Sequence, residues 1–195
     1  SITSNTEGAK ITVNSGDKVQ FRGNNATYCD GGSSCNMFGG STAGFEVEGN
    51  IMSLIYGDNF ATLTTLESAF TFYMLFKNCT GLTSAENLIL PSTTLVQSCY
   101  SSMFNGCSSL TTAPELPATT LAQSCYSSMF QSCTSLTTAP ALPATTLAGN
   151  CYSNMFYGCT GLTTAPKLPA TTLADSCYAG MFYGCTSLTT APALP

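Results

Sequence analysis

The eleven cysteines are the residues of this chain whose type and spacing could do chemistry. Zinc sites need three or four converging ligands, which come as short Cys-x-x-Cys pairs or as cysteine with histidine. Here Cys125 and Cys133 are separated by seven residues, and the chain has no histidine. The pattern therefore predicts no metal site, and it favours buried free thiols that serve as small apolar groups.

Two cysteines stand apart from the other nine. Cys29 and Cys35 flank a short Asp-Gly-Gly-Ser-Ser loop, and in an exported protein they could close a disulfide. The alternative is that both cysteines are free thiols in the loop. The other nine recur at regular intervals, and we expect them to be reduced and inaccessible: Cys79, Cys99, Cys107, Cys125, Cys133, Cys151, Cys159, Cys177 and Cys185.

Acid–base and nucleophilic chemistry have few candidates. Without histidine, the Ser-His and Cys-His arrangements are excluded. A glycosidase-like pair of carboxylates remains conceivable among Glu46, Glu48, Asp58 and Glu67. Neighbouring acids in a small β region are more often its solvated face, and the periodic Met and Tyr rows favour a core over a cofactor site. We therefore expect no enzyme and no cofactor.

A 26-residue repeat positions the nine regular cysteines. Leu95, Leu121, Leu147 and Leu173 end successive Thr-Thr-Leu steps, each 26 residues after the last. A fixed period in this range indicates stacked repeats, each of which buries its apolar face against the next. Within one unit, the apolar residues of 121–130 fall in two adjacent i, i+4, i+8 rows. This pattern predicts an amphipathic helix with Thr120 as its N-cap.

A short extended segment is expected after this helix. Pro140 and Pro143 are incompatible with a helix, and the preceding threonines suit pairing with their copies in neighbouring repeats. One helix and one short strand per 26 residues predict an α/β solenoid of leucine-rich repeats.

Phe130, Cys133, Leu136 and Pro143 form a pattern that returns in each unit. This pattern resembles the BspA-like class of bacterial leucine-rich repeats, although the strand is one residue longer than in that family. The resemblance covers roughly residues 64–195. It implies a surface-exposed or secreted adhesion or binding protein without enzymatic activity.

Two domains are predicted. Residues 1–57 form a small β-rich cap, with one hairpin at 10–22 and a second strand pair at 44–48 and 51–56 around a Gly-Asn turn. Residues 58–195 form the solenoid, with an irregular first repeat from 64 and regular repeats from 91. The last unit is expected to be truncated at Pro195, in the middle of a repeat.

The charge and hydropathy of the chain limit the classes of partner that it could bind. The net charge of −5 argues against nucleic acid, which a basic patch would bind. From residue 91 onward only Glu115, Lys167 and Asp175 are charged, so the repeats offer hydrogen bonds without long-range steering. No apolar run is long enough to span a membrane, and no export signal precedes the repeats.

The resemblance implies an extracellular or cell-surface module that binds a protein or glycan of a host or neighbouring cell, and the nearly uncharged repeats suit a glycan or an uncharged protein surface. The alternative is a passive spacer or display scaffold within a larger surface protein. The variable residues Tyr157 and Tyr183 favour binding, since a spacer has no need of exposed aromatics. The outward face of the strands is the expected binding face, with a hydroxyl ladder that could instead merely satisfy its own sheet. Its residues are Thr112, Glu115, Thr138, Ala141, Thr164, Lys167, Thr190 and Ala193.

Overall fold

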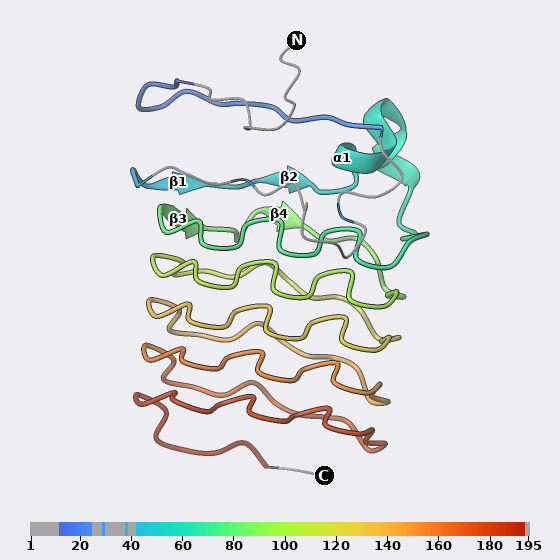
Figure 1. The fold of residues 1–195 in the computed structure, drawn as a ribbon, viewed down its shortest axis with the longest axis vertical. Coiled ribbons are helices and arrows are strands. Elements are labelled where there is room, and N and C mark those ends of the chain that lie inside the picture. The colour runs from blue at the N-terminus through green and yellow to red at the C-terminus, as the bar shows by residue number, and fades with distance from the viewer. Residues whose placement is uncertain (1–11, 25–28, 30–37, 39–41, 194–195) are drawn as a thin grey trace.

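The computed structural model describes residues 12–24, 29, 38 and 42–193. The repeats lie one above another as layers, in sequence order along the long axis (Figure 1). The helices and strands of the described chain all lie before residue 90. They are β1 (Phe45–Glu46), β2 (Gly49–Asn50), α1 (Ser53–Tyr56), the 3-10 helix η1 (Gly57–Thr62), β3 (Leu82–Ser84) and β4 (Leu88–Ile89).

One long side of each layer is a run of tight turns, which we call the turn segment (residues 95–107, 121–133, 147–159 and 173–185). Its amide groups alternate between two kinds of acceptor. The N–H of Cys125 donates to the carbonyl of Ala122 in the same layer (3.2 Å), and the next N–H, of Tyr126, donates to Cys151 of the following layer (3.0 Å). The same alternation continues to the end of the segment. Backbone hydrogen bonds therefore join each turn segment to the next.

The predicted helix over 121–130 is wrong, and so is its N-cap at Thr120. Ser124, Ser128 and Ser132 have φ values of 55°, 55° and 60°, so every fourth residue is left-handed. A residue in this region ends an α-helical turn and gives a β-turn with positive φ at its third position. The i, i+4 polar row that resembled the outer face of a helix is this row of left-handed residues. The apolar residues between them point in pairs into the core.

The other long side carries two threonine pairs separated by a proline-containing stretch, which we call the proline segment (residues 113–118, 139–144 and 165–170). Parallel bridges join Thr138 to Thr164 on one side of it and Thr146 to Thr172 on the other. This confirms the expected pairing through threonine. A continuous strand does not form in the described repeats from 91 onward, because the prolines lack the N–H that a ladder needs.

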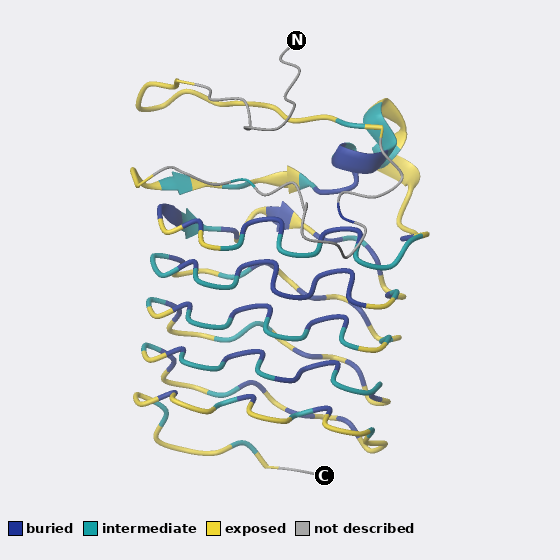
Figure 2. Cartoon of the chain, in the orientation of Figure 1, coloured by how far each residue is buried: buried dark blue, intermediate teal, exposed yellow. Residues whose placement is uncertain are grey.

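The buried residues recur at corresponding places in successive layers (Figure 2), and like side chains stack there in columns. The rings of Tyr126 and Tyr152 stack at 5.9 Å between centroids and 3° between planes. Leu136 is fully buried. The Cys133 thiol is also satisfied, because it donates to the carbonyl of Phe104 one layer back (3.2 Å). Stacked copies therefore supply the packing of the core and a backbone partner for this thiol.

The N-terminal region departs from the predicted hairpins. β1 and β2 pair in parallel with β3 and β4, not with each other. The second predicted strand, 51–56, contains α1 instead, with Leu54 and Ile55 buried. The local Gly-Asn signal suggested a hairpin turn, but pairing with the backbone of the next layer prevails. The domain boundary at residue 57 stays a prediction.

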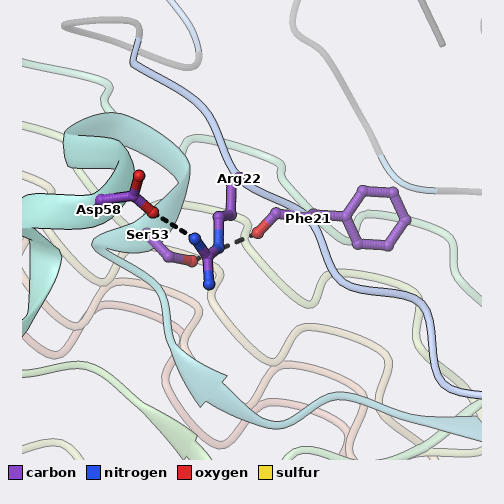
Figure 3. A network of polar contacts seen from close by, with 4 residues as sticks. All are labelled: Phe21, Arg22, Ser53 and Asp58. Carbon is purple, nitrogen blue, oxygen red and sulfur yellow. Dashed lines mark hydrogen bonds and ion pairs between the residues drawn. The ribbon is translucent and has the colours of Figure 1, made fainter. Parts of the chain in front are cut away.

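The described part of the first predicted hairpin, 12–22, has a turn but no strand. The N–H of Asp17 donates to the carbonyl of Asn14 (3.1 Å), whereas Val13 and Val19 are 50% and 42% exposed. Residues 10 and 11 lie outside the described residues. Arg22 forms an ion pair with Asp58, and the Ser53 hydroxyl donates to the Phe21 carbonyl at 3.5 Å (Figure 3). These contacts attach the segment to the region of α1 and η1.

Candidate functional site

The candidate binding face is the outer surface of the side that carries the proline segments. Leu142 and Ala144 are buried, whereas Ala141 and Pro143 between them are exposed. This alternation places all eight residues of the expected face on the surface: Thr112, Glu115, Thr138, Ala141, Thr164, Lys167, Thr190 and Ala193. Their part in binding stays a prediction.

Two shallow grooves hollow this face between adjacent layers. The larger, about 570 Å³, brings together Thr164, Lys167, Thr190 and Ala193. The other, about 370 Å³, lies between residues 113–117 and 140–143, and includes Glu115 and Ala141. Thr112 and Thr138 do not line these two grooves. Six of the eight expected residues therefore line a concave surface.

The threonine hydroxyls of the expected ladder divide into two roles. Thr163 donates its hydroxyl to the carbonyl of Thr137 one layer back (3.2 Å), and Thr111 does the same to Thr83 (2.9 Å). The second threonine of each pair is directed elsewhere. Thr112 lies 2.7 Å from the Ser84 hydroxyl, whereas the exposed Thr138 and Thr164 hydroxyls make no hydrogen bond within the described chain. Part of the ladder supports the stack, and part is free for a ligand.

A second threonine column on this face was missed by the sequence reasoning. Thr94, Thr120, Thr146 and Thr172 are exposed and lie at the far end of the proline segments. Parallel bridges join Thr94 to Thr120 and Thr146 to Thr172. The signal was the recurring Thr-Thr-Leu step, which was interpreted only as a helix cap. Hydroxyls therefore flank the prolines on both sides.

The proline segments leave backbone groups without backbone partners. None of the residues in 114–118, 140–144 or 166–170 takes part in a backbone–backbone hydrogen bond. Folded proteins pair nearly all of their buried backbone groups, so the amides and carbonyls of these segments are left to water or to a ligand. This feature lies directly beside the grooves, whose linings include Ala141 and Leu116.

The nine regular cysteines are free and buried. Burial raises the pKa of Cys99, Cys107 and Cys159 to about 12. These thiols are therefore neutral at physiological pH, and the thiolate that nucleophilic or metal chemistry needs is disfavoured. Cys29 is buried and disulfide-bonded, and Cys35, its expected partner, lies outside the described residues.

The acids considered for catalysis include two that form exposed ion pairs. Glu48 contacts Lys18 at 2.6 Å, and Asp58 contacts Arg22. No group of three or more His, Cys, Asp or Glu side chains in the described chain could hold a metal ion. Within the same residues, no helix is both long and apolar enough to cross a membrane.

One column of variable residues lies on the opposite, turn-segment side. Asn105 donates its amide to Gln131 (3.1 Å), and the rings of Tyr157 and Tyr183 stack at 4.9 Å with 17° between their planes. Tyr183 nevertheless stays 67% exposed, whereas the two grooves lie on the other side.

No protein-family model, curated protein or solved structure matches this chain. The BspA-like resemblance therefore rests on the repeat residues alone and stays a proposal.

Proposed function

We propose that this chain is a non-enzymatic binding module of a secreted or cell-surface protein, and that its stack is a variant of the BspA-like leucine-rich-repeat solenoid. The observation that carries the proposal is the exposed face of threonine and proline, hollowed by two grooves. A protein or glycan of a host or neighbouring cell is the proposed partner.

The stack suits binding because its face is already ordered before a ligand arrives. On this face, parallel bridges join Thr138 to Thr164 and Thr146 to Thr172, and the stacked rings of the core hold the same layers together. A preorganised surface loses little conformational entropy on binding. The ligand therefore gains most of the free energy of each contact that it makes.

The chemistry of the face favours an uncharged ligand. Glu115 and Lys167 are its charged residues, so hydrogen bonds and apolar contacts must supply the affinity. Each neutral hydrogen bond contributes about 0.5 to 1.5 kcal/mol net. Useful affinity therefore requires a ligand that contacts several layers at once.

The spacer alternative has one observation in its favour. The hydroxyls of Thr111 and Thr163 donate to backbone carbonyls of the preceding layer, which is a structural role. A spacer would present the same ladder without binding anything.

An array of glycans and extracellular-matrix proteins, probed with the purified chain, distinguishes a binding module from a passive spacer. We expect binding that the double variant Thr138→Lys, Thr164→Lys abolishes while the melting curve stays nearly intact. The matched control is Gln97→Lys, Gln123→Lys, which adds the same charge at exposed positions of the turn segments. Absence of any hit would favour the spacer, and equal loss in both double variants would show a general charge effect instead of a site.

A further inference from the structure

The grooves combine two features that the proposed function does not need by itself. They lie between layers, at the proline segments 113–118 and 139–144 and again near 165–170. The backbone amides and carbonyls of residues 114–117, 140–143 and 166–169, which belong to these linings or lie beside them, take part in no backbone–backbone hydrogen bond. The surface therefore offers donors and acceptors together, at fixed positions, flanked by the two threonine columns.

We propose that these grooves bind a neutral oligosaccharide, whose hydroxyls pair with the unpaired backbone groups of the proline segments. This inference rests on the proposed binding function and names its ligand class. A sugar hydroxyl donates one hydrogen bond and accepts two, so it can match either an amide or a carbonyl. Thr138 and Thr146, at the two ends of the proline segment 139–144, supply further hydroxyls of the same kind.

An extended peptide fits the same surface less well. A peptide that adds to a sheet edge needs alternating N–H and C=O groups along that edge. Pro140 and Pro143 remove two donors from each such run, so a regular ladder cannot form. Sugars have no such requirement, because their hydroxyls are not spaced along a backbone ladder.

An anionic ligand is also disfavoured. Lys167 lines one groove, but Glu115 lines the other, so the face has no consistent positive charge. Exposed prolines such as Pro143 and Pro169 add flat apolar patches against which the C–H faces of a sugar can pack. The chemistry therefore favours a neutral polymer long enough to contact more than one layer.

Isothermal titration calorimetry with neutral hexasaccharides tests the inference. The probes are cellohexaose, mannohexaose, xylohexaose and chitohexaose, with a heparin hexasaccharide and a proline-rich peptide as comparators. We expect at least one neutral hexasaccharide to bind and the two comparators not to bind.

The decisive variant is Ala141→Pro, which removes the N–H of a groove-lining residue that has no backbone partner. Ala141→Ser is its matched control, because it keeps the N–H at the same position. Loss of one neutral hydrogen bond predicts an affinity lower by roughly 2- to 12-fold for the proline variant and nearly unchanged for the serine variant. If Ala141→Pro does not fold, Ala141→Arg takes its place as the test. The arginine side chain fills the groove without altering the backbone, so it should also weaken binding.

The outcomes separate this inference from the proposed function. Array hits that are all proteins, with no neutral hexasaccharide bound, would overturn the inference and leave the binding module standing. A bound hexasaccharide whose affinity is the same for wild type, Ala141→Pro and Ala141→Arg would overturn the groove lined by Ala141 as its site. If neither the array nor the calorimetry detects a ligand, both this inference and the proposed binding function are contradicted.

Discussion

Removing the hydroxyl of Tyr126 should stabilise the protein. Tyr126 is 1% exposed, and its hydroxyl oxygen is buried without a hydrogen-bond partner in the structure, as are those of Tyr100 and Tyr152. Burial also raises the pKa of Tyr126 far above its ordinary value, so the phenol stays neutral and carries the full cost of its desolvated hydroxyl. Tyr126→Phe removes that group and keeps the ring. The column already accepts phenylalanine, because Phe72 stacks on Tyr100 at 5.9 Å.

The expected gain follows from the cost of an unpaired buried polar group, about 1 to 3 kcal/mol. For a chain of this size, about 1 kcal/mol corresponds to a shift of about 2 to 4 °C in the melting temperature. Tyr126→Phe should therefore melt at least about 2 °C higher than wild type by circular dichroism. Tyr183→Phe is the matched control: its side chain is 67% exposed, so we expect no change.

A fall in melting temperature for Tyr126→Phe would refute this reasoning, because it would mean that the hydroxyl has a partner, such as an ordered water. The reciprocal variant is Ala118→Ser. One layer back, Ser92 occupies the equivalent position beside Tyr100 and donates to the Thr64 carbonyl (2.6 Å). Burial raises the pKa of Tyr100, and the nearby Ser92 hydroxyl lowers it in part. The Tyr100 hydroxyl still has no hydrogen-bond partner in the structure. A serine at 118 should give Tyr126 the same neighbour and be stabilising or neutral.

Four further predictions concern the stack itself. Leu136→Asp should unfold or fray the middle layers, because it removes about 2 kcal/mol of burial and adds a larger penalty for a buried carboxylate; an unchanged melting midpoint would contradict this. The unfolded chain ionises its thiols near pH 9, whereas burial holds Cys99, Cys107 and Cys159 neutral to about pH 12, so stability should be constant below pH 9 and fall between pH 9 and 12. Thiol titration at pH 8 should find few reactive groups in native protein and at least nine after denaturation without reductant, and fewer than nine would show oxidised pairs. Ser128→Gly should be tolerated within about 1 kcal/mol at φ 55°, whereas Ser128→Val should cost more than about 1 kcal/mol, as chemical denaturation would show.

The stacked columns could be predicted because a repeat must match its own copies. Cys133 and Leu136 keep their type at every step of the repeat, and the structure buries both completely. The parallel pairing of Thr138 with Thr164 followed from the same argument. These predictions needed only the period and the side-chain chemistry.

The helix could not be separated from the turn run by period alone, because both place apolar residues at i and i+4. The discriminating signal was the residue type at the left-handed positions. Ser128 is replaced by Asn154 and then by Gly180 in the following layers, and all three have positive φ. Glycine and asparagine adopt this conformation most readily, so their recurrence every fourth residue indicated turns.

The proposed binding face could be predicted from the sequence only in part. The exposure of Ala141 and Lys167 followed from the alternation around them. The grooves and the unpaired backbone depend on how adjacent layers pair, which local patterns do not specify. In the same way, β1 pairs with β3 across 37 residues, from Phe45 to Leu82, and the Gly49-Asn50 signal gave no hint of that long-range contact.

Hydrogen–deuterium exchange of the whole chain, with and without a bound neutral hexasaccharide, tests the central claim most directly. We predict that the amides of Glu115, Leu116, Ala141 and Leu142 exchange fast in the free protein, because they lack backbone partners. These amides should slow on binding, while turn-segment amides such as that of Tyr126 are slow in both states. Slow exchange of these four amides in the free protein, or protection on binding confined to the turn segments, would contradict the account.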